Sequence, residues 1–441
     1  MPSVFDKSLK GVNVRHYKNT MNSPTVSMPV PDQVCIVMSQ HMGKPCSVLV
    51  SVKDQVKVGQ PIGNSDASFS APIHSSVSGE VIRIDQITMP NGMRSAAVVI
   101  RSDKQQTVFE KIAPPVVNDY PSFLQAIKDA GMVGLGGAGF PTHVKFSPRN
   151  LDEVNTLLVN AAECEPYITS DYRTMIEDAE SVLSGITMTM KYLELSQCII
   201  GIESNKPAAI EKMRKLVESD PRIKVVRLSS KYPQGAEKVL IYELTGKVVG
   251  EGMLPADVGV VVSNVTTLAS IDHVMRTGMP LVSRRITVDG SAIMEPKNVL
   301  VPIGTPIADI AAFCGGYKGT PRKILMGGPM MGTAVYDESY PVIKQNNALV
   351  FFDETQVEEW DETACIRCGR CVRACPMNLM PLWIEDSYQR KDVEALMEFK
   401  VNLCMECGCC AYVCPAKRHL VLVHRLAKGM VRNHRTAQTG A

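Results

Sequence analysis

Nine of the 14 cysteines in this 441-residue chain fall within fifty residues near its C-terminal end. They form two runs with the same spacing, in which gaps of two, two and three residues separate four cysteines and a proline follows. The runs are Cys365, Cys368, Cys371 and Cys375 before Pro376, and Cys404, Cys407, Cys410 and Cys414 before Pro415. Because a disulfide framework would spread cysteines more evenly along a secreted chain, this clustering indicates thiolates that bind metal.

The spacing of each run is that of bacterial two-cluster ferredoxins, in which the fourth cysteine of one run binds the cluster of the other. It therefore predicts two [4Fe–4S] clusters with crossed ligand sets. The first set is Cys365, Cys368, Cys371 and Cys414, and the second is Cys375, Cys404, Cys407 and Cys410. Zinc is the less favoured alternative, because zinc sites usually use two separate cysteine pairs. Cys409, beside Cys410, is expected to be a bystander.

A glycine-rich run is the second feature that could do chemistry. Five glycines lie between Gly131 and Gly139, where backbone N–H groups can converge on an anion. The run is neither a P-loop nor a regular dinucleotide fingerprint, so by itself a plain loop is an equally good interpretation. Lys145 follows closely and could pair with a phosphate group.

Polar residues also follow a short apolar stretch, Leu157–Val159, which is typical of a buried parallel strand. Asn160, Glu163 and Glu165 come directly after it. In an α/β fold, ligands bind at the carboxyl ends of strands, where such carboxylates can accept hydrogen bonds from ribose hydroxyls. The two features together favour a nucleotide-binding site.

The composition is that of an ordinary globular protein, with 45% hydrophobic residues, 21% charged residues and a formal charge of +2. The near-neutral charge gives no reason to expect nucleic acid as a partner. No apolar run approaches the ~18 residues that a membrane-spanning helix requires, and the N-terminus lacks a signal-peptide core. We therefore expect a cytoplasmic chain that reaches a membrane only through a partner.

The elements that must position these residues follow a βα order between residues 115 and 270, which predicts an α/β layer fold. The expected elements are helices over Phe123–Ala130 and Pro207–Glu218 and strands over Leu157–Ala161, Cys198–Ile202 and Lys224–Leu228. Residues 379–401, between the two cysteine runs, are predicted to be helical. From Ala416 to Ala441 the chain has six Lys or Arg and no acidic residue, which suits an anionic surface or a solvated helix equally well.

Two further stretches are predicted to be β-rich. Residues 25–102 have short strands between turns and resemble a barrel-sandwich hybrid, the fold of lipoyl and biotinyl carriers. The stretch comparable to their modified hairpin, residues 71–76, has no lysine, so a docking or structural module is preferred. Residues 284–335 resemble a β-grasp unit, with a strand over Ile286–Val288 and a helix that Thr305 caps and that ends at Phe313.

Several motifs resemble those of the NADH-binding subunit of respiratory complex I. They are Leu135–Thr142 with Lys145, Asn160–Pro166, Gly235–Glu237 and Ser263–Leu268. By position, the resemblance implies that Gly136, Gly137, Gly139, Lys145, Asn160, Glu163, Asn264 and Thr267 contact FMN. It places Phe140, Glu165 and Glu237 on the nicotinamide side. Ala162 and Ala236 replace acidic residues of that family, and the single-cluster cysteine pattern of that family differs.

The order of motifs along nearly the whole chain resembles the C subunit of the Rnf complex, a membrane-bound ferredoxin:NAD oxidoreductase. After the barrel-like module come residues 136–143, 163–171 and 327–332, and then the two cysteine runs. The resemblance implies a multidomain protein with α+β and α/β parts. Its parts are a barrel-sandwich hybrid (1–114), a Rossmann-like FMN/NADH-binding domain (115–275), a β-grasp unit of the SLBB type (276–350) and a helical ferredoxin-like 2[4Fe–4S] domain with a basic tail (351–441).

The same resemblance implies a peripheral subunit on the cytoplasmic face of the cell membrane. It would pass electrons between NAD(H), FMN and the clusters, with ferredoxin as an indirect partner and with Na⁺ or H⁺ translocation in other subunits. FMN suits this task because it exchanges electrons with NAD(H) in pairs and with clusters singly. No residue is expected to act as a catalytic acid or base. His41, His74 and His143 are expected to be structural.

Two alternatives remain. A soluble flavin and iron–sulfur reductase acting on a corrinoid or another acceptor is similar in its central motifs, but there the flavin domain opens the chain, whereas here about 130 residues precede the glycine run. The other alternative is a non-catalytic electron-transfer or assembly subunit whose glycine loop no longer binds flavin.

Overall fold

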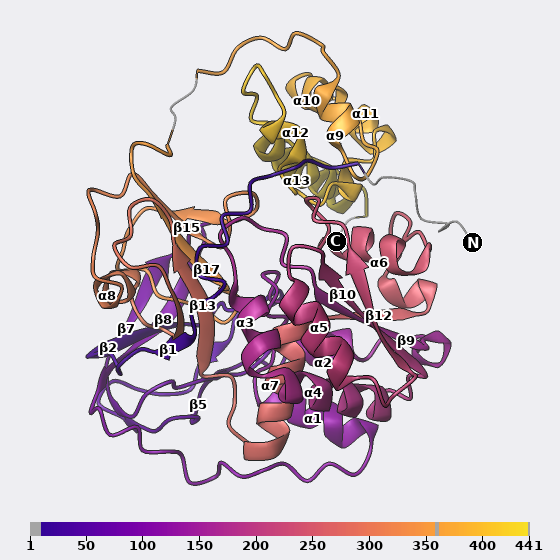
Figure 1. Cartoon of the computed structure of the whole chain (residues 1–441). Helices are drawn as coiled ribbons and strands as arrows, with labels where there is room; N and C mark the ends of the chain where they lie inside the picture. Colours follow the sequence, from indigo (N-terminus) through magenta and orange to yellow (C-terminus); the bar gives the residue numbers. More distant parts are fainter. Residues whose placement is uncertain (1–9, 358–360, 440–441) are drawn as a thin grey trace.

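The computed structural model describes residues 10–357 and 361–439. Figure 1 shows the C-terminal helices, in yellow, at one end of the molecule and the strand-rich parts below them. Each part has its own hydrophobic core. The α/β part lies beside the β-rich parts (Figure 1).

The N-terminal module consists of two small antiparallel sheets that enclose a core including Val34, Ile36, Ile62 and Ile100. One sheet has the order β2 (Gln33–Val37), β8 (Arg94–Ser102), β7 (Gly79–Thr88), β4 (Gln55–Val56), and the other β3 (Ser47–Val48), β5 (Pro61–Asn64), β6 (Ile73–His74).

The stretch of this module that corresponds to a carrier hairpin is buried against the rest of the chain. Ser76 donates a hydrogen bond to the carbonyl of Ile303, and Lys344 Nζ donates one of 2.6 Å to the carbonyl of Pro72. His74 is 5% exposed. The stretch therefore joins modules in this structure.

The central α/β part is built on a parallel sheet with the order β11 (Ile223–Leu228), β10 (Gln197–Glu203), β9 (Thr156–Ala161), β12 (Val260–Asn264). The strands β10, β9 and β12 are mostly buried and apolar, and helices cover both faces of the sheet, whereas the edge strand β11 carries Lys224 and Arg227. The helices are α1 (Tyr120–Asp129), α2 (Thr142–Lys145), α3 (Ser170–Glu177), α4 (Ala179–Tyr192), α5 (Pro207–Leu216), α6 (Glu237–Thr245) and α7 (Val265–Thr277), with the 3₁₀ turns η1 (Leu151–Glu153) and η2 (Pro255–Val258).

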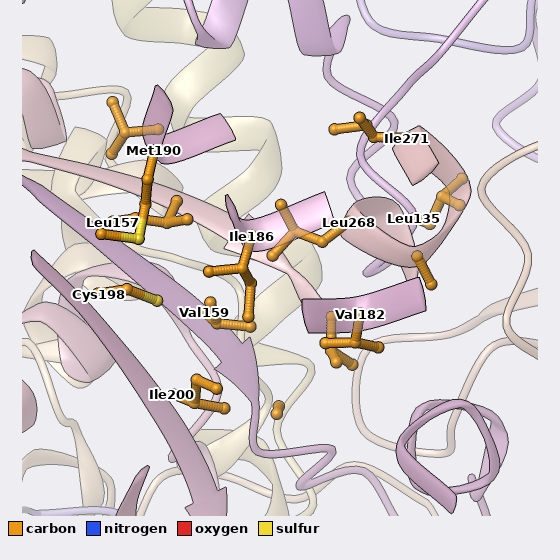
Figure 2. Packing of buried hydrophobic residues seen from close by; sticks show 14 of the residues in the cluster. Leu135, Leu157, Val159, Val182, Ile186, Met190, Cys198, Ile200, Leu268 and Ile271 are labelled. Atoms are coloured by element: carbon orange, nitrogen blue, oxygen red, sulfur yellow. The ribbon is translucent and has the colours of Figure 1, made fainter. Parts of the chain in front are cut away.

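Alternate residues of β9 separate the two faces of this sheet. Leu157 and Val159 pack against α4 and α7, as Figure 2 shows with Ile186 and Leu268 in the same cluster. Leu158 faces the opposite side, in the cluster that contains α6. Helices therefore cover both faces of the sheet, which the short apolar runs predict. The edge formed by the carboxyl ends of its strands remains available for a ligand-binding site.

The β-grasp part is a mixed sheet with the order β1 (Thr25–Ser27), β14 (Lys297–Pro302), β13 (Ser283–Asp289), β17 (Ala348–Phe352), β15 (Lys323–Met326), β16 (Thr333–Val335). Residues 25–27 were expected in the N-terminal module. Instead β1 pairs in parallel with β14, a pairing across about 270 residues that a local pattern cannot reveal.

The helix of this part, α8 (Ile307–Phe313), ends where the sequence predicts, but the predicted cap is wrong. Pro306 precedes the helix and no side chain caps it. The hydroxyl of Thr305 instead donates a 2.7 Å hydrogen bond to the carbonyl of Pro302. Thr305 therefore stabilises the turn after β14 rather than the helix.

The C-terminal part is helical and packs around Ile384, Leu396, Val401 and Val431. The segment 379–401, predicted to be helical, contains two helices separated by Lys391, whose φ is 57°. The elements are α9 (Arg370–Ala374), α10 (Pro381–Gln389), α11 (Val393–Glu398), η3 (Val401–Leu403), α12 (Cys409–Tyr412) and α13 (Leu420–Thr439). No helix in the described ranges is long and apolar enough to cross a membrane.

Candidate functional site

The strand order of the parallel sheet reverses between β9 and β12, because β10 and β11 extend it on one side and β12 on the other. A crevice outside the carboxyl ends at such a switch point is where open α/β sheets bind ligands. A cavity of about 560 Å³ lies there, within the size range of cofactor sites. Every residue expected to bind FMN or NADH lines it except Gly139: Gly136, Gly137, Phe140, Lys145, Asn160, Glu163, Glu165, Glu237, Asn264 and Thr267.

Hydrogen bonds tie the four motifs around this cavity. Thr267 Oγ1 accepts a 2.9 Å bond from the N–H of Leu135 and so fixes the start of the glycine loop on α7. Asn160 Nδ2 donates one of 2.8 Å to the carbonyl of Gly235. Motifs separated by up to 132 residues thus form one wall.

The glycine loop leaves room at the cavity. Gly137 has a φ of 114°, and a Cβ there would meet no atom within 4 Å. A Cβ on Gly136 would lie 3.4 Å from Asn264. Side chains at these two positions would therefore enter the cavity or crowd its wall.

Gly139 does not itself line the cavity. A side chain there would overlap Oε1 of Gln345, a residue of the β-grasp part that does line the cavity. The glycine at 139 therefore allows close packing of Gln345.

Asn264 sits at the N-terminus of α7. Its Oδ1 accepts hydrogen bonds from the N–H groups of Thr266 and Thr267, and its Nδ2 donates one of 2.7 Å to Asp171. Asp171 also accepts a 2.6 Å bond from the Thr266 hydroxyl, and burial raises its pKa. The side chain of Asn264 is thereby fixed at the cavity wall.

Glu163 occupies a left-handed backbone conformation, with φ at 50°. Its carboxylate accepts a 2.6 Å hydrogen bond from the N–H of Asp171, at the N-terminus of α3. Burial raises the pKa of Glu163 to about 7, and the nearby ammonium groups of Lys18 and Lys206 oppose that shift. Lys206 is fully buried and donates a 2.7 Å bond to the carbonyl of Ala162.

Lys18 holds the same loop from the opposite direction. Its Nζ donates to the carbonyls of Glu163 and Glu165, both at 2.9 Å, and of Ile168 at 2.5 Å. Next to it, Tyr17 stacks on Tyr167 with ring centroids 4.8 Å apart. The N-terminal segment therefore fixes the wall that carries both glutamates.

Glu165 is held by the β-grasp part. Its carboxylate accepts hydrogen bonds of 3.0 and 2.7 Å from the N–H groups of Met330 and Met331. A side chain on Gly328 would overlap this carboxylate. Burial raises the pKa of Glu165 to about 7, so the charge of this carboxylate depends on what enters the cavity.

Lys145 and Glu237 form a 2.8 Å ion pair at the cavity. Both side chains are partly exposed, and the ammonium group lies where it can reach an anion in the cavity.

The cysteines gather in the two crossed sets. Cys365, Cys368, Cys371 and Cys414 surround a small cavity of about 20 Å³. In the other set, burial raises the pKa of the Cys410 thiol, and the thiols of Cys404, Cys407 and Cys375 raise it further. Among the described residues, no group of three or more His, Cys, Asp or Glu side chains is arranged to hold a single metal ion.

The second cysteine set lies against the cavity wall. Tyr232 lines the cavity and donates a 2.8 Å hydrogen bond to the carbonyl of Cys407. The buried thiol of Cys409 faces the carbonyl of Tyr232 at 3.9 Å. Cys164, which lines the cavity, and Met330 pack in the same cluster as Cys407.

The residues present fit FMN and iron–sulfur clusters. Eight thiols in two sets of four are the donor set of two cubane clusters. Within the described chain, two buried oxygens at the large cavity have no hydrogen-bond partner, Thr142 Oγ1 and Gln345 Oε1, and each can bind a polar group of a ligand.

Several residues at the site were not predicted from the sequence: Lys18, Asp171, Lys206, Tyr232, Met330, Met331 and Gln345. Asp171 and the methionines lie in motifs that the sequence did single out. Lys18, Lys206 and Gln345 have no local signal, because their role depends on contacts with distant backbone carbonyls and glycines.

Four protein families match separate parts of the chain. They are the RnfC barrel sandwich hybrid domain (residues 7–105), the Nuo51 FMN-binding domain (127–273), the SLBB domain (285–334) and the 4Fe-4S dicluster domain (364–417). These matches confirm the expected fold class and the expected cofactors.

Curated proteins match most of the chain. The C subunit of the proton-translocating ferredoxin:NAD(+) oxidoreductase complex of Clostridium ljungdahlii is 44% identical over 86% of this chain and 84% of its own length. The C subunit of the Na(+)-translocating ferredoxin:NAD(+) oxidoreductase complex of Acetobacterium woodii is 40% identical over 86% of this chain and 89% of its own length. The C subunit of the ion-translocating oxidoreductase complex of Rhodobacter capsulatus is 36% identical over 87% of this chain and 75% of its own length.

Among solved structures, a chain of an NAD⁺-reducing [NiFe]-hydrogenase in the air-oxidized state is similar in fold. The TM-score is 0.51 at 18% identity, over 70% of this chain and 60% of the other.

Proposed function

Because this chain belongs to the family of the C subunits of ion-translocating ferredoxin:NAD(+) oxidoreductase (Rnf) complexes, we propose that it exchanges electrons between NAD(H), FMN and two [4Fe–4S] clusters as their peripheral electron-transfer subunit. In the complex this exchange is coupled to Na⁺ or H⁺ translocation by other subunits. The chain is thus part of an NAD-linked oxidoreductase.

Bound FMN supplies the exchange of a hydride with nicotinamide and of single electrons with a cluster. The chain's own residues bind and orient the reactants. We assign Gly136, Gly137, Asn264 and Thr267 to the flavin and Lys145 to its phosphate, since the loop is open there and the ammonium group faces the cavity. No residue is assigned as a catalytic acid or base.

The remaining carboxylates shape the nucleotide side. Glu165 and Glu237 line the cavity together with Phe140, and each is already oriented by a partner, Glu165 by two amides and Glu237 by Lys145. Oriented acceptors of this kind suit ribose hydroxyls. Their preset geometry lowers the ordering entropy that a nucleotide loses on binding.

Electron flow follows from the placement of the two cysteine sets. Cys407, of the set Cys375, Cys404, Cys407 and Cys410, packs against residues of the cavity wall, so a cluster held by this set would be placed to exchange electrons with the flavin. Cys365 and Cys368 of the other set are exposed. We assign that cluster to exchange with a partner protein of the complex.

The surface around this outer cluster suits a protein partner. Ile366 is 67% exposed beside Cys365, and Arg367, Arg370 and Arg373 are exposed around it. An apolar centre with a cationic rim favours an acidic partner surface. The chain then associates with the membrane through other subunits, on the cytoplasmic face where NAD(H) is available.

One observation carries the proposal: the wall of the cavity that we assign to FMN and NAD(H) contacts the cysteine loop of one cluster through Tyr232. The experiment is anaerobic purification of the full chain, followed by assays of acid-released flavin, iron and sulfide. NADH is then added while flavin absorbance and cluster electron paramagnetic resonance are followed.

We expect about eight iron per chain, one FMN, bleaching of the flavin and reduction of a cluster. Asn264→Leu serves as the matched variant. It removes a cavity-wall amide that contacts Asp171, and it should lower the FMN content while the iron content stays unchanged. A chain that binds iron but no flavin would be a non-catalytic electron-transfer subunit, which contradicts the proposal. Bound zinc without sulfide would also contradict it.

A further inference from the structure

Gln345 brings the β-grasp part into the candidate nucleotide cavity. It lines the cavity, and its amide packs so closely on Gly139 that any side chain at 139 would displace it. The motifs that resemble the complex I subunit lie in the α/β part, and the motif of the β-grasp part, residues 327–332, ends before Gln345.

The Oε1 atom of Gln345 is buried and accepts no hydrogen bond from the described part of the chain. Buried acceptors are rarely left unpaired, because the lost contact with water has to be replaced. A donor on a bound ligand would satisfy this atom.

The position of Gln345 is fixed by its neighbours. Arg284 Nε donates a 2.8 Å hydrogen bond to the carbonyl of Asn346, and Oδ1 of Asn346 accepts one of 2.8 Å from the N–H of Ile343. Lys344 Nζ donates one of 2.7 Å to the carbonyl of Gly131, before the glycine loop. The segment is therefore preorganised for binding.

The flat ring of Phe140 also lines the cavity, next in sequence to the glycine that Gln345 contacts. Phe69 packs edge-on against this ring, with centroids 4.8 Å apart, and so holds it in place. A flat heterocycle on Phe140 that carries an amide group would bring an N–H donor to Gln345.

We propose that Gln345 accepts a hydrogen bond from the carboxamide NH₂ of the nicotinamide ring and so contributes to nucleotide recognition. The proposal rests on the proposed function, because it assumes that NAD(H) enters this cavity. It makes the β-grasp part a direct contributor to the site.

The test uses a nucleotide that lacks the donor. In 3-acetylpyridine adenine dinucleotide a methyl group replaces the NH₂ and the carbonyl remains. Binding of NAD⁺ and of this analogue to the full chain is measured by calorimetry, which needs no electron transfer. Bleaching of the flavin by the two reduced forms is followed in parallel.

Gln345→Leu keeps bulk against Gly139 but removes the acceptor. We expect it to weaken NAD⁺ binding about 5- to 10-fold and to leave analogue binding within about twofold, with unchanged FMN content. Gln345→Glu retains an acceptor and should restore the preference for NAD⁺ over the analogue. Gln125→Leu, at an exposed position of α1, is the background control.

Equal weakening for both nucleotides would mean that Gln345 acts only through packing, and it would overturn the proposal. Loss of FMN from Gln345→Leu would assign the residue to the flavin instead and would also overturn it. If the wild-type chain binds both nucleotides but NADH does not bleach the flavin, the proposed function fails while the recognition role is still decided by the binding data.

Discussion

The hydroxyl of Tyr232 donates a 2.8 Å hydrogen bond to the backbone carbonyl of Cys407. Tyr232 is 2% exposed and lines the large cavity, while Cys407 belongs to the second cysteine set. A single buried side chain therefore spans the boundary between the α/β part and the C-terminal helical part, where the proposed function requires electrons to pass between flavin and cluster.

Replacing Tyr232 by phenylalanine should affect this boundary. The carbonyl of Cys407 would lose a buried donor, at a cost of about 1–3 kcal/mol. We expect NADH to bleach the flavin at an unchanged rate and to reduce the adjoining cluster more slowly, as measured by stopped-flow absorbance. Tyr242→Phe, on α6 and 36% exposed, should change neither rate. Equal slowing of both steps would contradict this view of the boundary.

The two neighbouring cysteines of the second run should differ in their effect on iron content. Cys407→Ser removes a proposed ligand and should reduce iron from about eight to about four per chain. Cys409→Ser should retain about eight, because the spacing of the run assigns Cys410 rather than Cys409 as the ligand. The measurement is iron and sulfide analysis after anaerobic purification. Loss of iron from Cys409→Ser would reassign the ligand set.

Lys18 should control how firmly flavin is held. Lys18→Met removes one ammonium group that donates to three carbonyls of the glutamate loop. A hydrogen bond from a charged group contributes about 1.5–3 kcal/mol, so we expect FMN affinity to fall at least tenfold. Fluorescence of released flavin on dilution measures this. Lys44→Met, at an exposed position, is the matched control and should retain flavin.

Stability above neutral pH should depend on Lys344. Burial lowers the pKa of Lys344 to about 7, below its ordinary value of 10.5. Between these values the unfolded chain binds more protons than the folded chain, so this group makes the free energy of unfolding rise with pH from about 7 to about 10.5.

Lys344→Met should remove that contribution. The melting temperature of the wild type minus that of the variant should therefore increase from pH 7 to pH 10, as followed by circular dichroism. A difference that stays constant over this range would mean that Lys344 titrates normally in the folded chain.

The sequence by itself determined the chemistry of the clusters. Cysteine spacing is a local property, since two-residue gaps place three thiolates on one side of a tight turn, and the crossed fourth ligand follows from the repeat of the motif. The parallel strands were equally visible, because strands covered on both faces, such as Leu157–Ala161, are continuous apolar runs.

Only the tertiary structure decided how the parts meet. The pairing of β1 with β14, the contacts of Lys18 with the glutamate loop and the position of Gln345 against Gly139 all join residues more than a hundred positions apart. Such contacts leave no periodic signal in the sequence, because each depends on one side chain and a distant backbone atom. Gly139 is one example: the sequence predicts it at the flavin, but it does not reveal that a side chain there would overlap Gln345.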